Sequence, residues 1–157
     1  MQERFLELIN NAEKNIYLAD HMTYMTFPLI QDNRLLFKIL EQLNSALLDI
    51  INSILQYEYF YKRIQLSKNQ KKNLEVFKEK CVPAYQISEK ELQDIFEIFT
   101  LYKKHKQSGF EFVKNGKVVI MSDNLKTETI TLDKIKSLLQ TSKDVFKKVS
   151  IKIRHRK

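Results

Sequence analysis

The 157-residue sequence contains only two glycines, two prolines, one cysteine and no tryptophan. So few glycines disfavour the glycine-rich loops that cradle phosphates, and the Walker and dinucleotide-binding fingerprints are both absent. The single cysteine, Cys81, rules out an intramolecular disulfide. No stretch approaches the roughly 20 apolar residues of a membrane span, and the first residues do not resemble a signal peptide. We therefore expect a cytoplasmic protein without a membrane partner.

Residues that carry chemistry are also sparse, since the histidines are only three: His21, His105 and His155. Asp20 and His21 stand together but have no nearby His, Cys or Asp to complete a metal site. Cys81 falls in an apolar register with no histidine near it, which indicates a buried thiol rather than a nucleophile. We predict no catalytic residue, no metal site and no cofactor.

Positive charge, by contrast, is abundant and unevenly distributed. Residues 1–100 hold 12 basic and 14 acidic side chains, whereas residues 101–157 hold 15 basic and 5 acidic ones. Such segregation is typical of proteins that bind polyanions. Lysine outnumbers arginine by 22 to 5, which favours non-specific phosphate attraction over bidentate reading of bases.

The stretch from Asp32 to Ile64 contains neither glycine nor proline and carries apolar side chains at helical spacing. It predicts a central helix capped by Asp32, with a stripe so wide that several neighbours must cover it. Its end is rich in aromatic residues at positions 57–61, followed by Lys62 and Arg63. These rings are interpreted either as the rim of the core or as a platform on which nucleic-acid bases stack.

Three further helices are predicted around this one. The first covers residues 2 to about 25, ends before Pro28 and carries an apolar stripe of Phe5, Ile9, Ala12, Ile16 and Ala19. The third begins at a capping box, Ser67–Gln70, and is stopped by Pro83; the fourth begins at a second capping box, Ser88–Glu91. The outer face of the third helix has a net charge of +3, which is either simply solvated or an extension of a basic surface; its charged residues are Lys68, Lys71, Lys72, Glu75, Lys78, Glu79 and Lys80.

From Phe110 the apolar spacing changes to that of strands. Asn115-Gly116 predicts a two-residue hairpin turn, and residues 127–132 predict a third strand. One face of the sheet, expected to be covered, carries Phe110, Phe112, Val119 and Met121. The other face, expected to be only partly covered, carries Val113, Val118 and Ile120.

Together these patterns predict one domain, residues 1–157, of the mainly α (α+β) class. Residues 1–108 form an antiparallel bundle of four helices, and residues 109–132 a three-stranded antiparallel β-meander. Residues 133–150 form a C-terminal helix that packs on the meander or the bundle. Residues 151–157 are a basic tail of the kind that binds polyanions.

The first helix, with LINNAEKNIYLADHM, and the second, with ILEQLNSALLDIINSIL, resemble the HEPN class of helical bundles, many of which are RNA-cleaving toxins or nucleotidyltransferase-associated relatives. The whole chain, with ADHM, PLIQDNRLL, EKCVPAY, KHKQSGFEF and VIMSDNLKTETIT, looks like a family of small uncharacterised archaeal proteins. The HEPN nuclease signature, Arg followed after four to six residues by His, is absent, since only Lys14 and Lys148 stand at the far spacing. The resemblance therefore implies the bundle architecture alone.

The expected function is that of a non-catalytic RNA-binding or ribonucleoprotein-associated protein that docks through its basic C-terminal third. The predicted nucleic-acid-binding residues are Lys103, Lys104, His105, Lys106, Lys114, Lys117, Lys147, Lys148, Lys152, Arg154 and Arg156. Residues 103–106 are expected to form one continuous positive surface with Lys114 and Lys117 or with the lysines of the last helix. Alternatives are a HEPN-like endoribonuclease or toxin-system subunit with an altered site, and an oligomeric scaffold for an acidic protein partner. A homodimer through the nearly neutral helical half is also expected.

Overall fold

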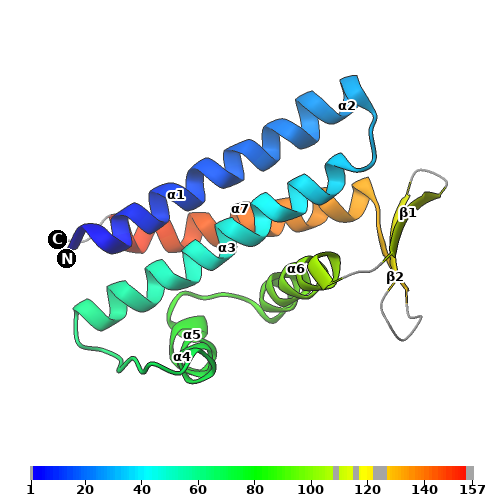
Figure 1. Cartoon of the computed structure of the whole chain (residues 1–157). Helices are drawn as coiled ribbons and strands as arrows, with labels where there is room; N and C mark the ends of the chain where they lie inside the picture. Colours follow the sequence, from blue (N-terminus) through cyan, green and yellow to red (C-terminus); the bar gives the residue numbers. More distant parts are fainter. Residues whose placement is uncertain (1, 108–109, 115–116, 122–126, 155–157) are drawn as a thin grey trace.

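The computed structural model describes residues 2–107, 110–114, 117–121 and 127–154, and it confirms the mainly helical class (Figure 1). Four long helices form the core: α1 (Gln2–His21), α3 (Leu35–Phe60), α6 (Glu89–Gln107) and α7 (Leu132–Arg154). α3 contacts the other three, and α7 also packs on α1 and α6. The last helix is therefore an integral wall of the core rather than an addition to a bundle completed by residue 108.

The apolar stripes predicted for α1 and α3 are confirmed by burial. The buried stripe of α1 is Phe5, Ile9, Ala12, Ile16 and Ala19, and that of α3 includes Leu36, Leu40, Leu43, Leu47, Ile50 and Ile54. The two helices also share a buried polar contact, because Ser53 Oγ donates to the carbonyl of Phe5 at 2.8 Å. This contact satisfies a hydroxyl that would otherwise be costly to bury.

Both prolines are followed by more helix, contrary to the sequence prediction. α1 continues through a π-helical turn, Met22–Thr26, into the short helix α2 (Phe27–Ile30), which contains Pro28. In the π turn Phe27 N–H donates to the carbonyl of Met22, five residues back. This wider turn lets the chain accommodate a proline, which has no N–H of its own to donate.

The third predicted helix repeats this arrangement. It consists of α4 (Gln70–Val76), a π turn (Phe77–Cys81) and α5 (Val82–Ala84), so it runs through Pro83 instead of stopping there. It ends at Ala84, and Gln86, two residues further on, has a φ of 56° in the left-handed region.

Of the two predicted capping boxes, one is confirmed and one is wrong. Ser88 N–H donates to Glu91 Oε1 at 2.9 Å, and Glu91 N–H donates to Ser88 Oγ at 3.1 Å. At the start of α4, however, the cap is Asn69, whose side chain accepts the N–H of Lys71 at 2.9 Å. Ser67 lies outside the helix because its hydroxyl accepts the N–H of Asn69.

The central helix is shorter at both ends than predicted. Asp32 precedes it and accepts the N–H of Arg34 at 3.0 Å, and the helix begins at Leu35. It ends at Phe60, because Lys62 adopts a left-handed φ of 61°.

Three strands form an antiparallel sheet in the order β1-β2-β3: β1 (Phe110–Lys114), β2 (Lys117–Met121) and β3 (Thr127–Ile130). Lys114 pairs with Lys117, and the predicted turn residues Asn115 and Gly116 lie outside the described part of the chain.

The covered face of the sheet is the opposite of the predicted one. Val118 and Ile120 are each 1% exposed and Ile130 is fully buried, whereas Val119 and Met121 are half-buried. The register explains the difference, because Val118 stands opposite Ile130. The side chains of Phe110 and Phe112 are not among those the structure describes.

The predicted basic tail is helical as far as the structure describes it. α7 continues to Arg154, and Ile153 is fully buried in the core. The sequence predicts a tail here because the core residues that bury Ile153 are distant in the sequence and leave no local signal.

Candidate nucleic-acid interface at the end of helix α3

The basic residues predicted as a docking surface are in part engaged in holding the fold together. Four of them pair with acids: Lys104 with Glu128, His105 with Glu111, Lys148 with Glu91 and Arg154 with Glu13. The last two pairs join α7 to α6 and to α1. Part of the positive charge of the last third therefore has an acidic partner from another element.

The other predicted residues are differently placed. Lys106 lies over the ring of Tyr102 at 5.5 Å, and Lys152 lies over the ring of Tyr85 at 4.7 Å. Lys103, Lys117 and Lys147 are exposed, as Lys106 and Lys152 also are. Two cannot be placed: the side chain of Lys114 and the whole of Arg156 lie outside what the structure describes.

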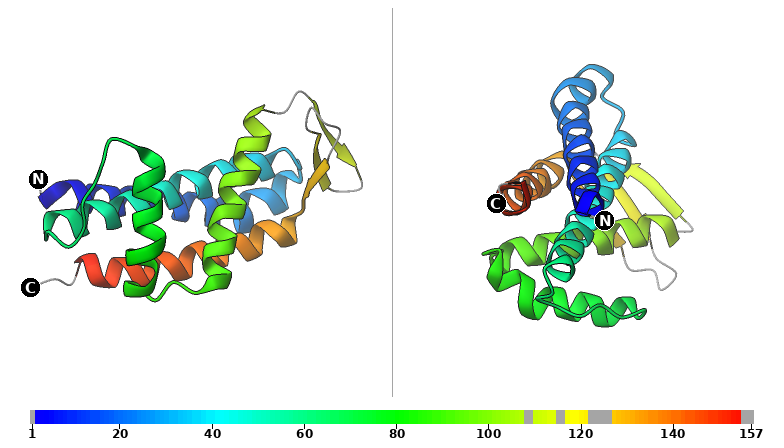
Figure 2. Two further views of the ribbon diagram at one scale, coloured as in Figure 1. Left: turned by 90° about the horizontal axis from the view of Figure 1, so that it is seen from below. Right: turned by 90° about the vertical axis from the view of Figure 1, so that its left-hand side faces the viewer.

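These residues do not gather on one surface with the lysines of the last helix. The start of α6 lies beside Lys148, through the pair with Glu91. Residues 103–106 follow along α6 by about 20 Å at the rise of an α-helix. Figure 2 shows the sheet and the C-terminus at opposite ends of the molecule. A continuous surface that joins residues 103–106 to Lys148, Lys152 and Arg154, in the C-terminal half of α7, is therefore not formed. The alternative surface, with Lys114 and Lys117, stays a prediction.

His105 and Cys81 have structural surroundings. The imidazole of His105 stacks on Phe37, with ring centroids 4.2 Å apart, and its Nδ1 lies 2.6 Å from Glu111 Oε2. Cys81 is 1% exposed, and burial raises the pKa of its thiol to about 11. The predicted burial of the thiol is confirmed. Among the described residues, no group of three or more His, Cys, Asp or Glu side chains is arranged to hold a metal ion.

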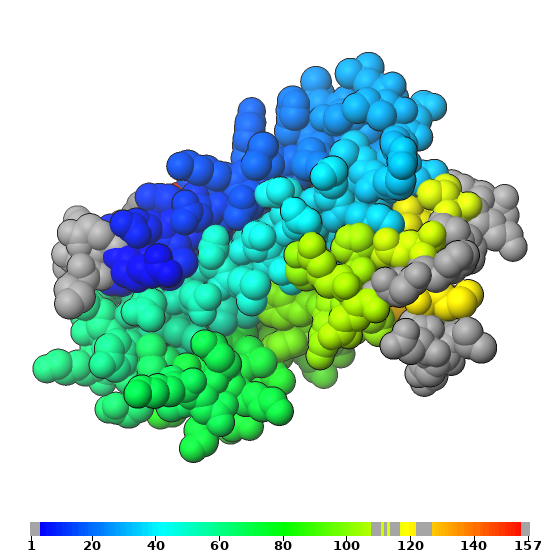
Figure 3. Space-filling view, in the orientation of Figure 1, coloured from blue at the N-terminus to red at the C-terminus, as the bar shows by residue number. Residues whose placement is uncertain are grey.

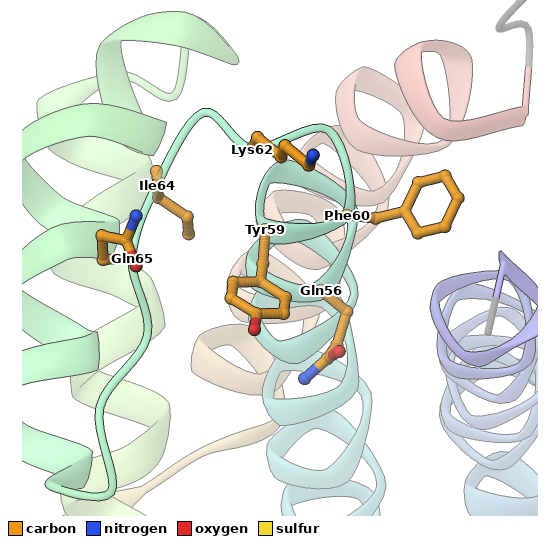
Figure 4. A pocket seen from close by; sticks show the side chains of 6 residues that line it. All are labelled: Gln56, Tyr59, Phe60, Lys62, Ile64 and Gln65. Carbon is orange, nitrogen blue, oxygen red and sulfur yellow. The ribbon is translucent and has the colours of Figure 1, made fainter.

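A pocket of about 530 Å³ lies at the C-terminal end of α3, and we call it the terminal pocket. Its lining residues are Gln56, Tyr59, Phe60, Lys62, Ile64 and Gln65. In Figure 4, Tyr59 and Gln56 project from α3, and Phe60 points to the other side of the helix end. Ile64 and Gln65 lie on the segment between α3 and α4, which we call the connector. The pocket thus combines aromatic and apolar surface with two amides and one ammonium group, the mixture typical of ligand sites.

Aromatic rings at this end are unusually exposed. The exposed fractions are 50% for Tyr59, 42% for Phe60 and 37% for Tyr61. Phe60 and Tyr61 contact each other edge-to-face, with centroids 5.0 Å apart. Within the described part of the chain, the side chain of Tyr59 has neither a hydrogen bond nor a ring contact, so the face of its ring is available to a ligand.

A buried carboxylate fixes the connector beside this pocket. Glu58 is 9% exposed, and Arg63 grips it with two hydrogen bonds, Nε to Oε1 at 2.7 Å and Nη2 to Oε2 at 3.0 Å. Tyr85, which follows α5, donates its hydroxyl to Glu58 Oε2 at 2.7 Å. Arg63 also lies over the rings of Tyr57 and Tyr61, at 5.5 and 5.2 Å. One carboxylate thus ties together α3, the connector and the chain after α5.

The protonation states within this network are well defined. Burial acts to raise the pKa of Glu58, but the hydrogen bonds from Arg63 and Tyr85 and the charges of Arg63 and Lys152 outweigh it, so the pKa is lowered. Burial and the bond to Glu58 raise the pKa of Tyr85. Glu58 is therefore ionised at neutral pH and balances the charge of Arg63.

The connector turns back from α3 through a left-handed residue. Arg63 N–H donates to the carbonyl of Glu58 and Lys62 N–H to that of Tyr59, each at 2.9 Å, which is the Schellman arrangement with Lys62 at the position that glycine usually occupies. A lysine in this conformation is strained by about 1 kcal/mol or more. The turn places Lys62 at the mouth of the terminal pocket.

We define the basic segment as residues 62–72. It contains five basic residues and no acid, and the acid-free stretch extends from 59 to 74. Because Arg63 is neutralised by Glu58, four exposed cations remain, and none has an ion pair within the described residues: Lys62, Lys68, Lys71 and Lys72. In Figure 3 the teal and green atoms of this part of the chain protrude along the lower edge of the molecule.

Sequence patterns pointed to part of this site. The aromatic run and the lysines of α4 were both recognised, each with a competing structural interpretation. Gln56, Ile64 and Gln65 were missed, because the pocket depends on the turn at Lys62, and a lysine is not a signal for a left-handed residue.

No protein-family model matches the chain, and no curated protein and no solved structure is significantly similar to it. The resemblance to HEPN bundles and to archaeal proteins therefore stays a prediction. Over the described residues, every helix is too short or too polar to cross a membrane.

Proposed function

We propose that this is a non-catalytic RNA-binding protein that contacts RNA through the terminal pocket and the basic segment. The observation that carries this proposal is the coincidence, at one end of α3, of exposed aromatic rings with four unpaired lysines and no acid from residue 59 to residue 74. Exposed rings offer surfaces for bases, and lysines release counterions from phosphates.

This location differs from the C-terminal third that net charge favours. In the last third, Lys104, Lys148 and Arg154 already have acidic partners. A cation in an ion pair must give up that partner to bind a phosphate, so it contributes less to binding. Among the residues that the structure describes, no acid pairs with the lysines of the basic segment.

A salt series tests the proposal. If four lysines each contact one phosphate of a single strand, the affinity for oligouridine RNA should fall about 50-fold between about 50 and 200 mM salt, a slope near −3 in logarithmic units. Fluorescence anisotropy of the labelled RNA measures this slope. A flat dependence, or no RNA binding with retention of polyglutamate instead, would contradict the proposal and favour an acidic protein partner.

We also propose that the protein forms a homodimer through the outer face of α1 and α2. This face exposes large apolar side chains at fractions of 46–86%: Tyr17, Leu18, Tyr24, Met25, Leu29 and Ile30. Within residues 17–30 the only ionisable acid or base side chains are Asp20 and His21, and Asp20 pairs with Lys143. Two lysines of α7 border this face at Tyr24, with Lys136 Nζ 5.4 Å and Lys143 Nζ 5.7 Å from the centroid of its ring. The face therefore carries little charge and meets its own copy with little repulsion.

Leu29→Glu is the variant that tests the dimer, because Leu29 is 86% exposed. We expect the native chain to scatter light as a dimer at micromolar concentration and the variant as a monomer of equal thermal stability. Leu48→Glu, at a 45% exposed position on α3, should remain dimeric. A native chain that is a clean monomer would refute this arrangement.

A further inference from the structure

The terminal pocket has a shape and chemistry that discriminate between forms of RNA. It is open to solvent at the end of α3, and its exposed aromatic surface includes the face of Tyr59, which has no partner within the described residues. In a duplex each base is already stacked on its neighbours and pairs through its edge. An unstacked base, by contrast, presents both a face and an edge.

We infer that the terminal pocket takes an unpaired base of single-stranded RNA, with the ring of Tyr59 stacked on the base. This inference rests on the proposed function and specifies the ligand class of the same site. The amides of Gln56 and Gln65 line the same pocket and supply donors and acceptors for the edge of the base. Each amide offers both kinds of group, so the pocket accepts more than one base.

The lysines are placed to hold the backbone on either side of that base. Lys62 lines the pocket itself, and Lys68 follows Gln65 by three residues, which limits its backbone to about 10 Å from that of Gln65. Lys71 and Lys72 begin α4 immediately beyond. A strand that places a base against Tyr59 therefore has cations within reach of its neighbouring phosphates.

The pocket is also held in place before any ligand arrives. Arg63 and Tyr85 fix the carboxylate of Glu58, and the Schellman hydrogen bonds fix the turn at Lys62. A preformed stacking surface loses less conformational entropy on binding than a mobile one.

The absence of tryptophan from the chain allows a direct test. Tyr59→Trp introduces a single tryptophan in the pocket, and stacking on a base should quench its fluorescence when oligouridine RNA is added but not when an RNA duplex of equal length is added. Leu48→Trp, at a 45% exposed position on α3 outside the proposed dimer face, is the matched control and should not respond to either RNA.

Affinity measurements separate this inference from the proposed function. Tyr59→Ala should weaken oligouridine binding about 5- to 150-fold without changing the salt slope, whereas Tyr59→Phe should bind like the native protein because it keeps the ring. Native affinity in Tyr59→Ala, or equal binding of duplex and single strand, would overturn the inference and leave RNA binding by the basic segment intact. If the native protein binds neither oligouridine nor the duplex, both this inference and the proposed function are refuted.

Discussion

Neutralising Lys68, Lys71 and Lys72 to glutamine should weaken RNA binding about 100-fold at about 0.1 M salt and reduce the salt slope by about two units. Each lysine that contacts a phosphate of a single strand contributes about 0.7 to that slope, so the loss of three removes about 2.1 units. At about 0.1 M salt, one slope unit corresponds to about one decade in affinity. Anisotropy titrations of labelled oligouridine at several salt concentrations measure both quantities.

The matched control removes the same charge elsewhere. Lys14, Lys103 and Lys147 are also exposed, and they lie on α1, α6 and α7. Changing them to glutamine should leave most of the affinity in place. Equal losses in the two triple variants would mean that net charge alone attracts RNA, and a larger loss in the control would return the docking surface to the C-terminal third. Exposed lysines contribute little to stability, so both variants should fold.

The second large effect concerns stability. Arg63→Met should lower the free energy of unfolding by about 2 kcal/mol, because it leaves the buried carboxylate of Glu58 without its cation. This value lies below the roughly 3–5 kcal/mol typical of broken buried pairs, since the side chain of Arg63 is 51% exposed and Tyr85 still donates to the carboxylate. Urea denaturation followed by circular dichroism measures the change.

A similar ion pair serves as the control. Arg34 donates two hydrogen bonds to Asp32 in the same geometry, Nε to Oδ1 at 3.1 Å and Nη2 to Oδ2 at 2.9 Å. This pair lies on the surface, whereas Glu58 is buried. Arg34→Met should therefore leave stability unchanged within error. An equal loss of stability in the two variants would show that burial of Glu58 is not the cause. No loss of stability in Arg63→Met would mean that the network around Glu58 does not hold this site in place.

Acid should weaken the same network. Because the pKa of Glu58 is lowered in the folded state, the network stabilises the fold fully above the ordinary carboxyl value of 4.5 and loses this contribution as the pH falls through the folded-state pKa. The stability gap between the native protein and Glu58→Gln should therefore be constant near neutral pH and narrow below pH 4.5. A gap that widens in acid would mean that the pKa of Glu58 is raised rather than lowered.

Some features that depend only on neighbouring residues were predicted correctly from the sequence, although the Ser67–Gln70 capping box was not. The apolar stripe of α1 and the Ser88–Glu91 capping box are examples, because helical spacing and a three-residue interval contain the whole signal. Features decided by distant residues were not. The covered face of the sheet depends on the pairing of Val118 with Ile130, and the helical end of α7 depends on burial of Ile153.

The same distinction explains the candidate site. Composition placed the positive charge in the last third, but it did not reveal that Lys148 and Arg154 would meet acids 57 and 141 residues away. The sequence shows the aromatic run at the end of α3 but does not predict its exposure. Local sequence does not indicate which rings are buried in the core and which stay exposed to solvent. A basic residue therefore contributes fully to polyanion binding only if it has no acidic partner within the fold.

The position of α7 in the core has a consequence for how the chain folds. α1 and α3 are close in sequence and can pair early, but the groove between them and α6 is closed by residues 132–154. During synthesis this apolar groove stays open until α7 has emerged, because side chains such as Ile153 are needed to seal it. Contacts between such distant segments slow folding and leave apolar surface exposed meanwhile. We therefore expect nascent chains of this protein to expose apolar surface, of the kind that chaperones bind, until most of α7 has been made.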